Sequence, residues 1–163
     1  MARYHMHKKE REIKDNEELL EILKQGKYAV ISICRNNEPY VVTLSYGYDK
    51  DNNSLYFHTA AKGLKIDFIK QNPNVCATVI DDKGYVMNEC NHMFRSVVFW
   101  GEMSVVHDIE EKKHGLEILL NHLEENPKEL EEKFLKSDET LKKTTLLRLD
   151  IKELTGKSNI TKE

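Results

Sequence analysis

The sequence predicts a mainly β domain with added helices, of the α+β class, built around a small antiparallel barrel of six strands. Three β-rich segments follow one another between residues 28 and 59, separated only by short polar turns. A long β run covers residues 94–106, and the helical segments do not alternate with strands as in a parallel α/β sheet. This order of elements favours a barrel with helices packed outside it. The whole chain, residues 1–163, is expected to form one domain.

The first part of the chain supplies a helix and three strands. Asp15 or Asn16 is suited to cap a helix that ends at Gly26, because both side chains accept hydrogen bonds from the first free amides. β-Branched and aromatic residues then predict strands over residues 28–34, 39–48 and 54–59. Asn and Asp are common in both intervening turns, which favours hairpin connections. The three strands are therefore expected to form an antiparallel meander.

A second helix and two further strands follow. A helix that begins at Gly63 must stop before Pro73, because proline cannot continue it, and a strand is predicted over residues 75–80. Residues 85–93 are predicted to be a loop. The run 94–106 is predicted to be a strand with a bulge or bend at Gly101.

The last part of the chain is predicted to be helical and then extended. Asp108 and Glu111 have the spacing of a capping box, and leucines that share one helical face follow them. A further helical piece is expected over residues 128–136 and a closing strand over residues 144–151. The two ends are expected to be a charged arm, residues 1–14, and a frayed tail, residues 155–163.

The composition restricts the function. No stretch approaches the roughly 20 apolar residues of a membrane helix, and the N-terminus has no apolar signal region, so a cytoplasmic protein without membrane contact is expected. A net charge of −3 argues against a nucleic-acid partner. Three widely spaced cysteines do not form a disulfide framework, and Cys90 with His92 alone is a weak metal signal. No metal site is predicted.

The clearest candidate site is the strand, turn and helix of residues 54–73. Amides at a helix start lack partners within the helix and attract anions, and Lys62 and Lys65 lie in or near the first turn. Thr59 adds a hydroxyl at the strand end. Ordinary solvated lysines are the competing interpretation. Alternation along the strand places His58 on the face opposite Thr59, where it is either a structural histidine or an imidazole positioned near a reacting group.

The sequence leaves the roles of three further residues open. Arg95 and Ser96 precede a buried run and either lie at an edge or face a ligand. Trp100 favours the core or a subunit interface. The sequence contains no Gly-x-Gly-x-x-Gly motif, Walker loop or Gly-x-Ser-x-Gly elbow, so a Rossmann-type dinucleotide site is not expected.

The order of these motifs resembles the flavin-binding split barrel of the pyridoxamine-phosphate-oxidase-like superfamily, and more narrowly its nitroimidazole-reductase (Nim) branch. The resemblance extends from the charged arm at Lys9 to Lys157. Its most specific pieces are Glu38-Pro39-Tyr40-Val41-Val42-Thr43-Leu44-Ser45-Tyr46-Gly47-Tyr48, Leu55-Tyr56-Phe57-His58-Thr59-Ala60, Gly63-Leu64-Lys65, Asn72-Pro73-Asn74-Val75-Cys76, and Phe94-Arg95-Ser96-Val97-Val98 with Gly101.

This resemblance implies flavin mononucleotide (FMN) held at the interface of a homodimer, with FAD or haem as alternatives. Thr59 and Lys65 would bind the phosphate, and His58 would face the substrate side as a catalytic or substrate-orienting residue. A strand segment would run beneath the isoalloxazine ring and offer backbone groups to it, namely Val42, Thr43, Leu44 and Ser45. Either Arg95 or Ser96 would close the pocket.

The implied activity is a flavin-dependent oxidoreductase. NAD(P)H would bind transiently and electrons would pass to a small electron-poor, nitroaromatic-type acceptor, which predicts ping-pong kinetics. Oxidases that act on pyridoxamine phosphate carry an Arg-Lys pair where this chain has Leu64-Lys65, so that activity is not expected. The alternatives are a non-catalytic flavin- or haem-binding module that acts as a sensor, store or carrier, and an interaction protein that has lost its ligand.

Overall fold

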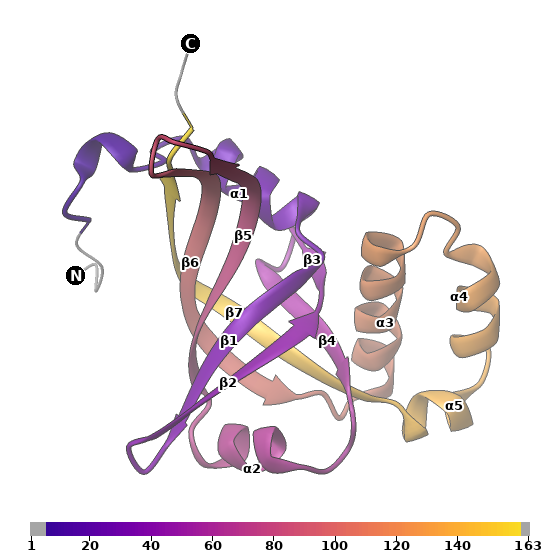
Figure 1. Cartoon of the computed structure of the whole chain (residues 1–163). Helices are drawn as coiled ribbons and strands as arrows, with labels where there is room; N and C mark the ends of the chain where they lie inside the picture. The colour runs from indigo at the N-terminus through magenta and orange to yellow at the C-terminus, as the bar shows by residue number, and fades with distance from the viewer. Residues whose placement is uncertain (1–5, 161–163) are drawn as a thin grey trace.

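A computed structural model describes residues 6–160 and places their strands in one antiparallel sheet of seven strands (Figure 1). The sheet order is β2-β1-β5-β6-β7-β4-β3. The sheet is strongly curved but not closed, since β2 and β3 are its two edges. The strands are β1 (Tyr28–Arg35), β2 (Glu38–Ser45), β3 (Gly47–Asp49), β4 (Ser54–Thr59), β5 (Asn74–Val86), β6 (Asn91–Val105) and β7 (Thr145–Ser158).

The seventh strand arises because the segment predicted as one strand, residues 39–48, divides at Tyr46. β2 pairs with β1, whereas β3 pairs with β4 at the opposite edge of the sheet. Tyr46 is fully buried between them, and its hydroxyl donates to the carbonyl of Leu23 at 2.7 Å. The prediction of six strands was therefore wrong in its count, while the α+β class is confirmed. The predicted meander of three successive strands was also wrong, because β2 and β4 are not neighbours in the sheet.

The turn between β1 and β2 has the geometry that its sequence predicts. Asn36 and Asn37 both have positive φ, 47° and 65°. Positive φ at both central residues is the requirement of a type I′ turn, whose twist matches that of paired strands. This turn fixes the register of the hairpin, with Arg35 opposite Glu38.

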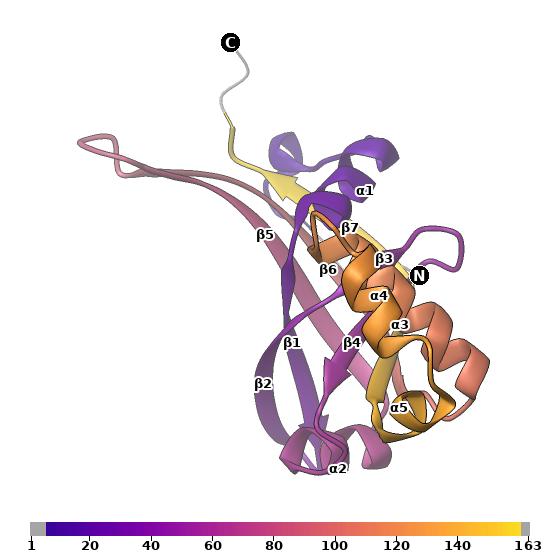
Figure 2. The ribbon, with the colours of Figure 1, turned by 90° about the vertical axis from the view of Figure 1, so that its right-hand side faces the viewer.

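Two segments predicted to be irregular are partly strands. Within residues 85–93 only residues 87–90 form a turn, because β5 and β6 pair as far as Val86 and Asn91 and project from the body as a long hairpin (Figure 2). The frayed tail is also wrong over residues 155–158, where β7 continues and pairs with β6. Residues 161–163 of that tail and 1–5 of the predicted arm lie outside the described residues. Ile13, within the arm, is buried and donates its amide to the carbonyl of Gly156.

Six helical segments complete the chain, and no helix within residues 6–160 has the length and apolar character needed to cross a membrane. Asp15 and Asp108 cap α1 and α3 as predicted, accepting from the amides of Glu17 and Glu111. The segment α5 was not predicted. The helices are η1 (Lys9–Arg11), α1 (Asn16–Gln25), α2 (Leu64–Gln71), α3 (Ile109–Leu123), α4 (Lys128–Phe134) and α5 (Asp138–Lys143).

The buried apolar side chains form two clusters. The larger fills the concave side of the sheet beneath α1 and α2 and includes Phe57, Phe68 and Phe99, all fully buried. The smaller lies on the other side of β4 and β7, where α3 packs its leucine stripe over Tyr56 and Leu146. Apolar transfer stabilises both clusters, and α3 to α5 are thereby attached to the outside of the sheet.

A polar contact also fastens α3 to the sheet. The carboxylate of Asp49 at the end of β3 is buried, and it lies 2.6 Å from Nε2 of His114 on α3. It also accepts from the side chain of Asn52 at 2.8 Å. Burial alone would raise the pKa of Asp49, but the hydrogen bonds from Asn52 and His114 outweigh it and lower that pKa.

Substituting Asp49 tests this contact. Because the folded-state pKa is lowered, the carboxylate contributes stability above its unfolded pKa, and the contribution is lost as pH falls through the folded pKa. We expect Asp49→Asn to lose about 1–2 kcal/mol of unfolding free energy at neutral pH and less at acidic pH. Urea unfolding at both pH values measures this, with exposed Asp51→Asn as the control. A loss independent of pH would contradict the assignment.

Candidate functional site

The turn from β4 to α2 presents a helix start without a side-chain cap. Gly63 occupies the cap position with φ 135°, a conformation that side chains disfavour, and no heavy atom lies within 4 Å of where its Cβ would be. Asp67 and Ile66 already donate to the Gly63 carbonyl. The preceding amides of the first turn have no partner inside the helix and present their dipole to the turn.

Thr59 ends β4 next to this turn, and its side chain lacks a partner. It is 9% exposed, and its Oγ1 has no hydrogen-bond partner among residues 6–160. A buried hydroxyl without a partner is costly, so such groups usually mark a place for a water or a ligand. His58 points to the opposite side of the strand and is exposed. The separation of these two side chains agrees with the alternation predicted from the sequence.

The two lysines differ in their surroundings. Lys65 is half-buried in the first turn of α2, whereas Lys62 is exposed in the turn before it. Because Lys65 belongs to the first turn of α2, its charge and the helix dipole can act on one anion. Of the two, Lys65 is the better anion ligand.

β2 is an edge strand, so it can offer backbone groups to a ligand. One side of its backbone pairs with β1, and the other side has no strand partner within the described sheet. Val42 and Leu44 pack against the core, while Thr43 and Ser45 are exposed. β2 also lies close to β4 across the opening of the sheet. The strand predicted to lie beneath a flavin ring is therefore accessible beside β4.

Arg95 and Ser96 occupy different surroundings from Thr59. Arg95 donates to Asp81 at 3.0 and 2.8 Å and to Glu21 of α1 at 3.2 Å. The helix α1 lies at the end of the sheet away from α2 (Figure 1). Asp81 has a lowered pKa because hydrogen bonds from Lys83 and Arg95 outweigh its burial. Ser96 lies on the opposite side of β6. Within one chain, neither residue is brought to the turn between β4 and α2.

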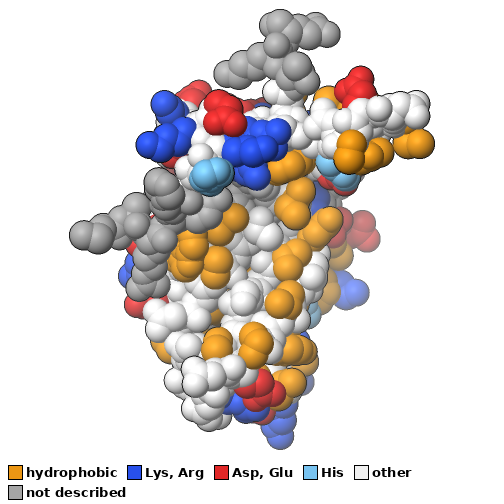
Figure 3. Space-filling view, turned by 60° about the vertical axis from the view of Figure 1, so that its left-hand side comes forward, with side chains coloured by type: hydrophobic (Ala, Val, Ile, Leu, Met, Phe, Trp, Pro, Cys, Tyr) orange, Lys and Arg blue, Asp and Glu red, His pale blue; other side chains and the backbone are white. Residues whose placement is uncertain are grey.

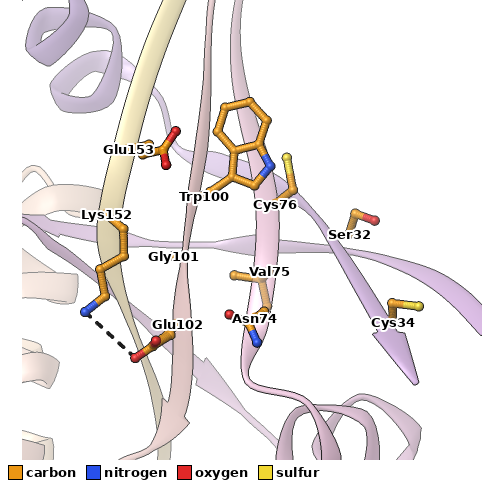
Figure 4. A pocket seen from close by; sticks show the side chains of 10 residues that line it. All are labelled: Ser32, Cys34, Asn74, Val75, Cys76, Trp100, Gly101, Glu102, Lys152 and Glu153. Carbon is orange, nitrogen blue, oxygen red and sulfur yellow. Dashed lines mark ion pairs between the residues drawn. The ribbon is translucent and has the colours of Figure 1, made fainter. Parts of the chain in front are cut away.

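The convex side of the sheet is called the outer face here, and it is defined by the cross-strand neighbours Val41, Ser32, Cys76 and Trp100. Ser96 lies on the same face, four residues before Trp100. No described helix covers it, and hydrophobic side chains are spread along this side up to the β5–β6 hairpin (Figure 3). A hollow of about 480 Å³ opens there between Trp100, Cys76 and an ion pair of Lys152 with Glu102 (Figure 4).

The turn between β4 and α2 fits a phosphate group. A buried hydroxyl without a partner among residues 6–160, a lysine in the first helical turn and a helix start without a side-chain cap are donors from which a phosphate monoester accepts. Gly63 lies within the predicted segment 54–73, but it was not itself predicted as a binding residue. Its signal in the sequence is the lack of Ser, Thr, Asp or Asn at the cap position, which leaves the first amides available to a ligand.

The fold is a curved, half-open antiparallel sheet, and its candidate site is the strand-to-helix turn between β4 and α2. The family model described as "Pyridoxamine 5′-phosphate oxidase" matches residues 15–158. The chain belongs to this family.

Several solved structures share the fold. A Bacteroides thetaiotaomicron VPI-5482 protein, provisionally described as a 5-nitroimidazole antibiotic resistance protein, is 28% identical, with 94% of this chain and 95% of that chain covered and a TM-score of 0.73. The flavocytochrome Anf3 from Azotobacter vinelandii is 20% identical over 97% and 73% of the two chains, with a TM-score of 0.80. The FAD and heme binding protein from Mycobacterium smegmatis is 17% identical over 94% and 76%, with a TM-score of 0.75.

One curated relative also matches. It is an uncharacterized protein of Rhizobium meliloti (strain 1021), 28% identical over 89 residues. The match covers 55% of this chain, and the chain spans about half the length of that relative, 53%.

Proposed function

We propose that this protein is an FMN-dependent oxidoreductase that takes reducing equivalents from NAD(P)H and reduces small electron-poor acceptors of the nitroaromatic type. The observation that carries the proposal is the buried hydroxyl of Thr59, which has no partner among residues 6–160 and ends the strand that leads into Lys65 and the uncapped start of α2. The similarity to the Bacteroides protein, which covers nearly all of both chains, supports the acceptor class. When bound, the flavin would supply two-electron redox chemistry.

Different residues of the chain would bind the phosphate and the ring of the flavin. Thr59, Lys65 and the first amides of α2 would hold the phosphate, and the free backbone edge of β2 from Val42 to Ser45 would hold the polar edge of the ring. His58 would lie on the acceptor side, because its exposed imidazole points away from Thr59. Leu64 stands where pyridoxamine-phosphate oxidases carry arginine, so we do not propose oxidation of that vitamin.

We further propose that the protein acts as a homodimer. The outer face carries exposed Val41 and Ile80, at 56% and 53%, and continues onto the β5–β6 hairpin. Ser96 lies on this face, so it can join a flavin site only if two copies meet there. Sedimentation or light scattering with and without FMN tests the oligomeric state, and a flavin-loaded monomer would contradict the dimer.

The ligand and reaction can be tested directly on the purified chain. We expect a yellow protein whose released ligand has the mass of FMN, and whose flavin is bleached by NADH or NADPH and restored by a nitroaromatic acceptor. Parallel initial-rate lines would fit the expected ping-pong order. Protein that retains no flavin after incubation with FMN would refute the cofactor, and bound flavin that neither nicotinamide reduces would refute the electron donor.

His58 allows a separate test of the reacting side. We expect His58→Gln to keep FMN affinity but to lower kcat/KM for the acceptor by about tenfold, because one hydrogen bond to a charged or polarised group is lost. Exposed His7→Gln is the matched control. An unchanged rate would assign His58 no role in the reaction.

A binding module is the second candidate. Two neighbours of the same fold are a flavocytochrome and an FAD and heme binding protein, so this fold accommodates haem as well as flavin. The visible spectrum of the purified protein separates the two candidates, because haem gives an intense Soret band and flavin gives two broad bands. Stable flavin that passes no electrons to an acceptor screen would favour a store or carrier.

A further inference from the structure

The C-terminal end of α2 is fixed to the turn between β1 and β2 by two contacts. The guanidinium carbon of Arg35 lies 4.1 Å from the centre of the Phe68 ring, and Phe68 is fully buried. At the end of the helix, Asn72 donates from its side-chain amide to the carbonyl of Cys34 at 3.0 Å. The Tyr40 ring of β2 packs on Phe68 as well, with 5.5 Å between ring centres.

These contacts join α2 to β2, and the two elements bind different parts of the flavin in the proposed site. α2 carries the phosphate donors at its N-terminal end, and β2 carries the ring-binding edge from Val42 onward. Arg35 and Tyr40 hold opposite ends of the β1–β2 turn against the same helix residue, Phe68. The spacing between the phosphate donors and the ring strand therefore depends on a cluster that lies away from the proposed ligand contacts.

We propose that Arg35 is a positioning residue that holds α2 and β2 at the spacing required by a phosphorylated flavin, and so selects FMN over riboflavin. The inference rests on the proposed flavin function. A planar cation over an aromatic ring restricts sliding between the two surfaces more than an apolar contact does. Without it, α2 can shift relative to β2, and the phosphate donors lose their fixed distance from the ring. Riboflavin has no phosphate, so its binding depends on β2 and not on this distance.

Two titrations of the same protein test the proposal. FMN and riboflavin are titrated by fluorescence quenching into wild type, Arg35→Ala and Asn72→Ala. We expect each substitution to weaken FMN binding by about three- to tenfold and to leave riboflavin binding nearly unchanged, because only the phosphate contribution is lost. The ratio of the two affinities separates positioning from general destabilisation, since a smaller folded fraction weakens both ligands equally. Asn72→Ala, which acts through the second contact, provides the same test if Arg35→Ala does not fold.

Glu38→Gln is the matched control. It removes the ion pair between Glu38 and Arg35 at 3.2 Å but leaves the guanidinium over Phe68. Its side chain is 60% exposed, so the pair should contribute little and the affinity ratio should match wild type. An unchanged ratio in both Arg35→Ala and Asn72→Ala would refute the positioning role while leaving the flavin function intact. Wild-type protein that binds neither flavin would instead refute the proposed function, and with it this inference.

Discussion

Lys65→Ala is expected to weaken FMN binding by about 1–3 kcal/mol, a loss of roughly 5- to 150-fold in affinity. Lys65 is half-buried in the first turn of α2, where its ammonium group and the helix dipole would act on the same anion. Removing the side chain leaves the phosphate with the Thr59 hydroxyl and backbone amides alone. The dissociation constant of FMN, measured by fluorescence titration at fixed ionic strength, gives the effect.

Lys62→Ala is the control for this substitution. It removes the same charge three residues earlier from an exposed position, so its effect should be within about twofold and should disappear at high salt. Equal losses for the two variants would mean that only the general positive field matters. A wild-type affinity for Lys65→Ala would remove Lys65 from the site.

Gly101→Ala is expected to lower the free energy of unfolding by about 3 kcal/mol. Gly101 lies at the register shift between β6 and β7, where the two backbones approach closely. An added Cβ would lie 2.1 Å from the carbonyl oxygen of Asp150 and 2.9 Å from a methyl carbon of Leu149. Backbone atoms in the middle of a sheet cannot move aside cheaply, so the strands must separate locally. Urea or thermal unfolding measures the loss.

Substitution of a second glycine, Gly84, distinguishes the effect of steric overlap from that of backbone strain. Gly84 lies at the other bulge of the sheet with φ 92°, but nothing lies within 4 Å of its added Cβ. Gly84→Ala should therefore cost only about 1 kcal/mol, from its left-handed backbone. If both variants lose the same stability, the close contact at Gly101 is not what requires glycine there.

The parts of the fold that follow local rules were predictable. Asn36 and Asn37 indicated a tight turn, and Asp15 and Asp108 indicated helix starts, because each effect depends on a few adjacent residues. The β5–β6 hairpin was not predictable in the same way. Its outer half faces solvent, as Met87 with 74% exposure illustrates, so it lacks the alternating apolar pattern that marks a half-buried strand.

The candidate site was predictable only in part. The sequence indicated Thr59, Lys65 and a helix start, since these are neighbours along the chain. It could not indicate that the Thr59 hydroxyl lacks a partner, because that depends on the surrounding fold. Nor could it place Arg95, whose partners Asp81 and Glu21 come from β5 and α1. The roles assigned to His58, Arg95 and Ser96 at the flavin stay predictions.

The hydroxyl of Thr59 also has a consequence for the chain before any ligand arrives. Under the proposed function, FMN accepts a hydrogen bond from this hydroxyl only in the folded chain, so FMN stabilises the fold by mass action. Newly made protein would then be the more vulnerable form, and cofactor supply in the cell would influence how much of it escapes degradation.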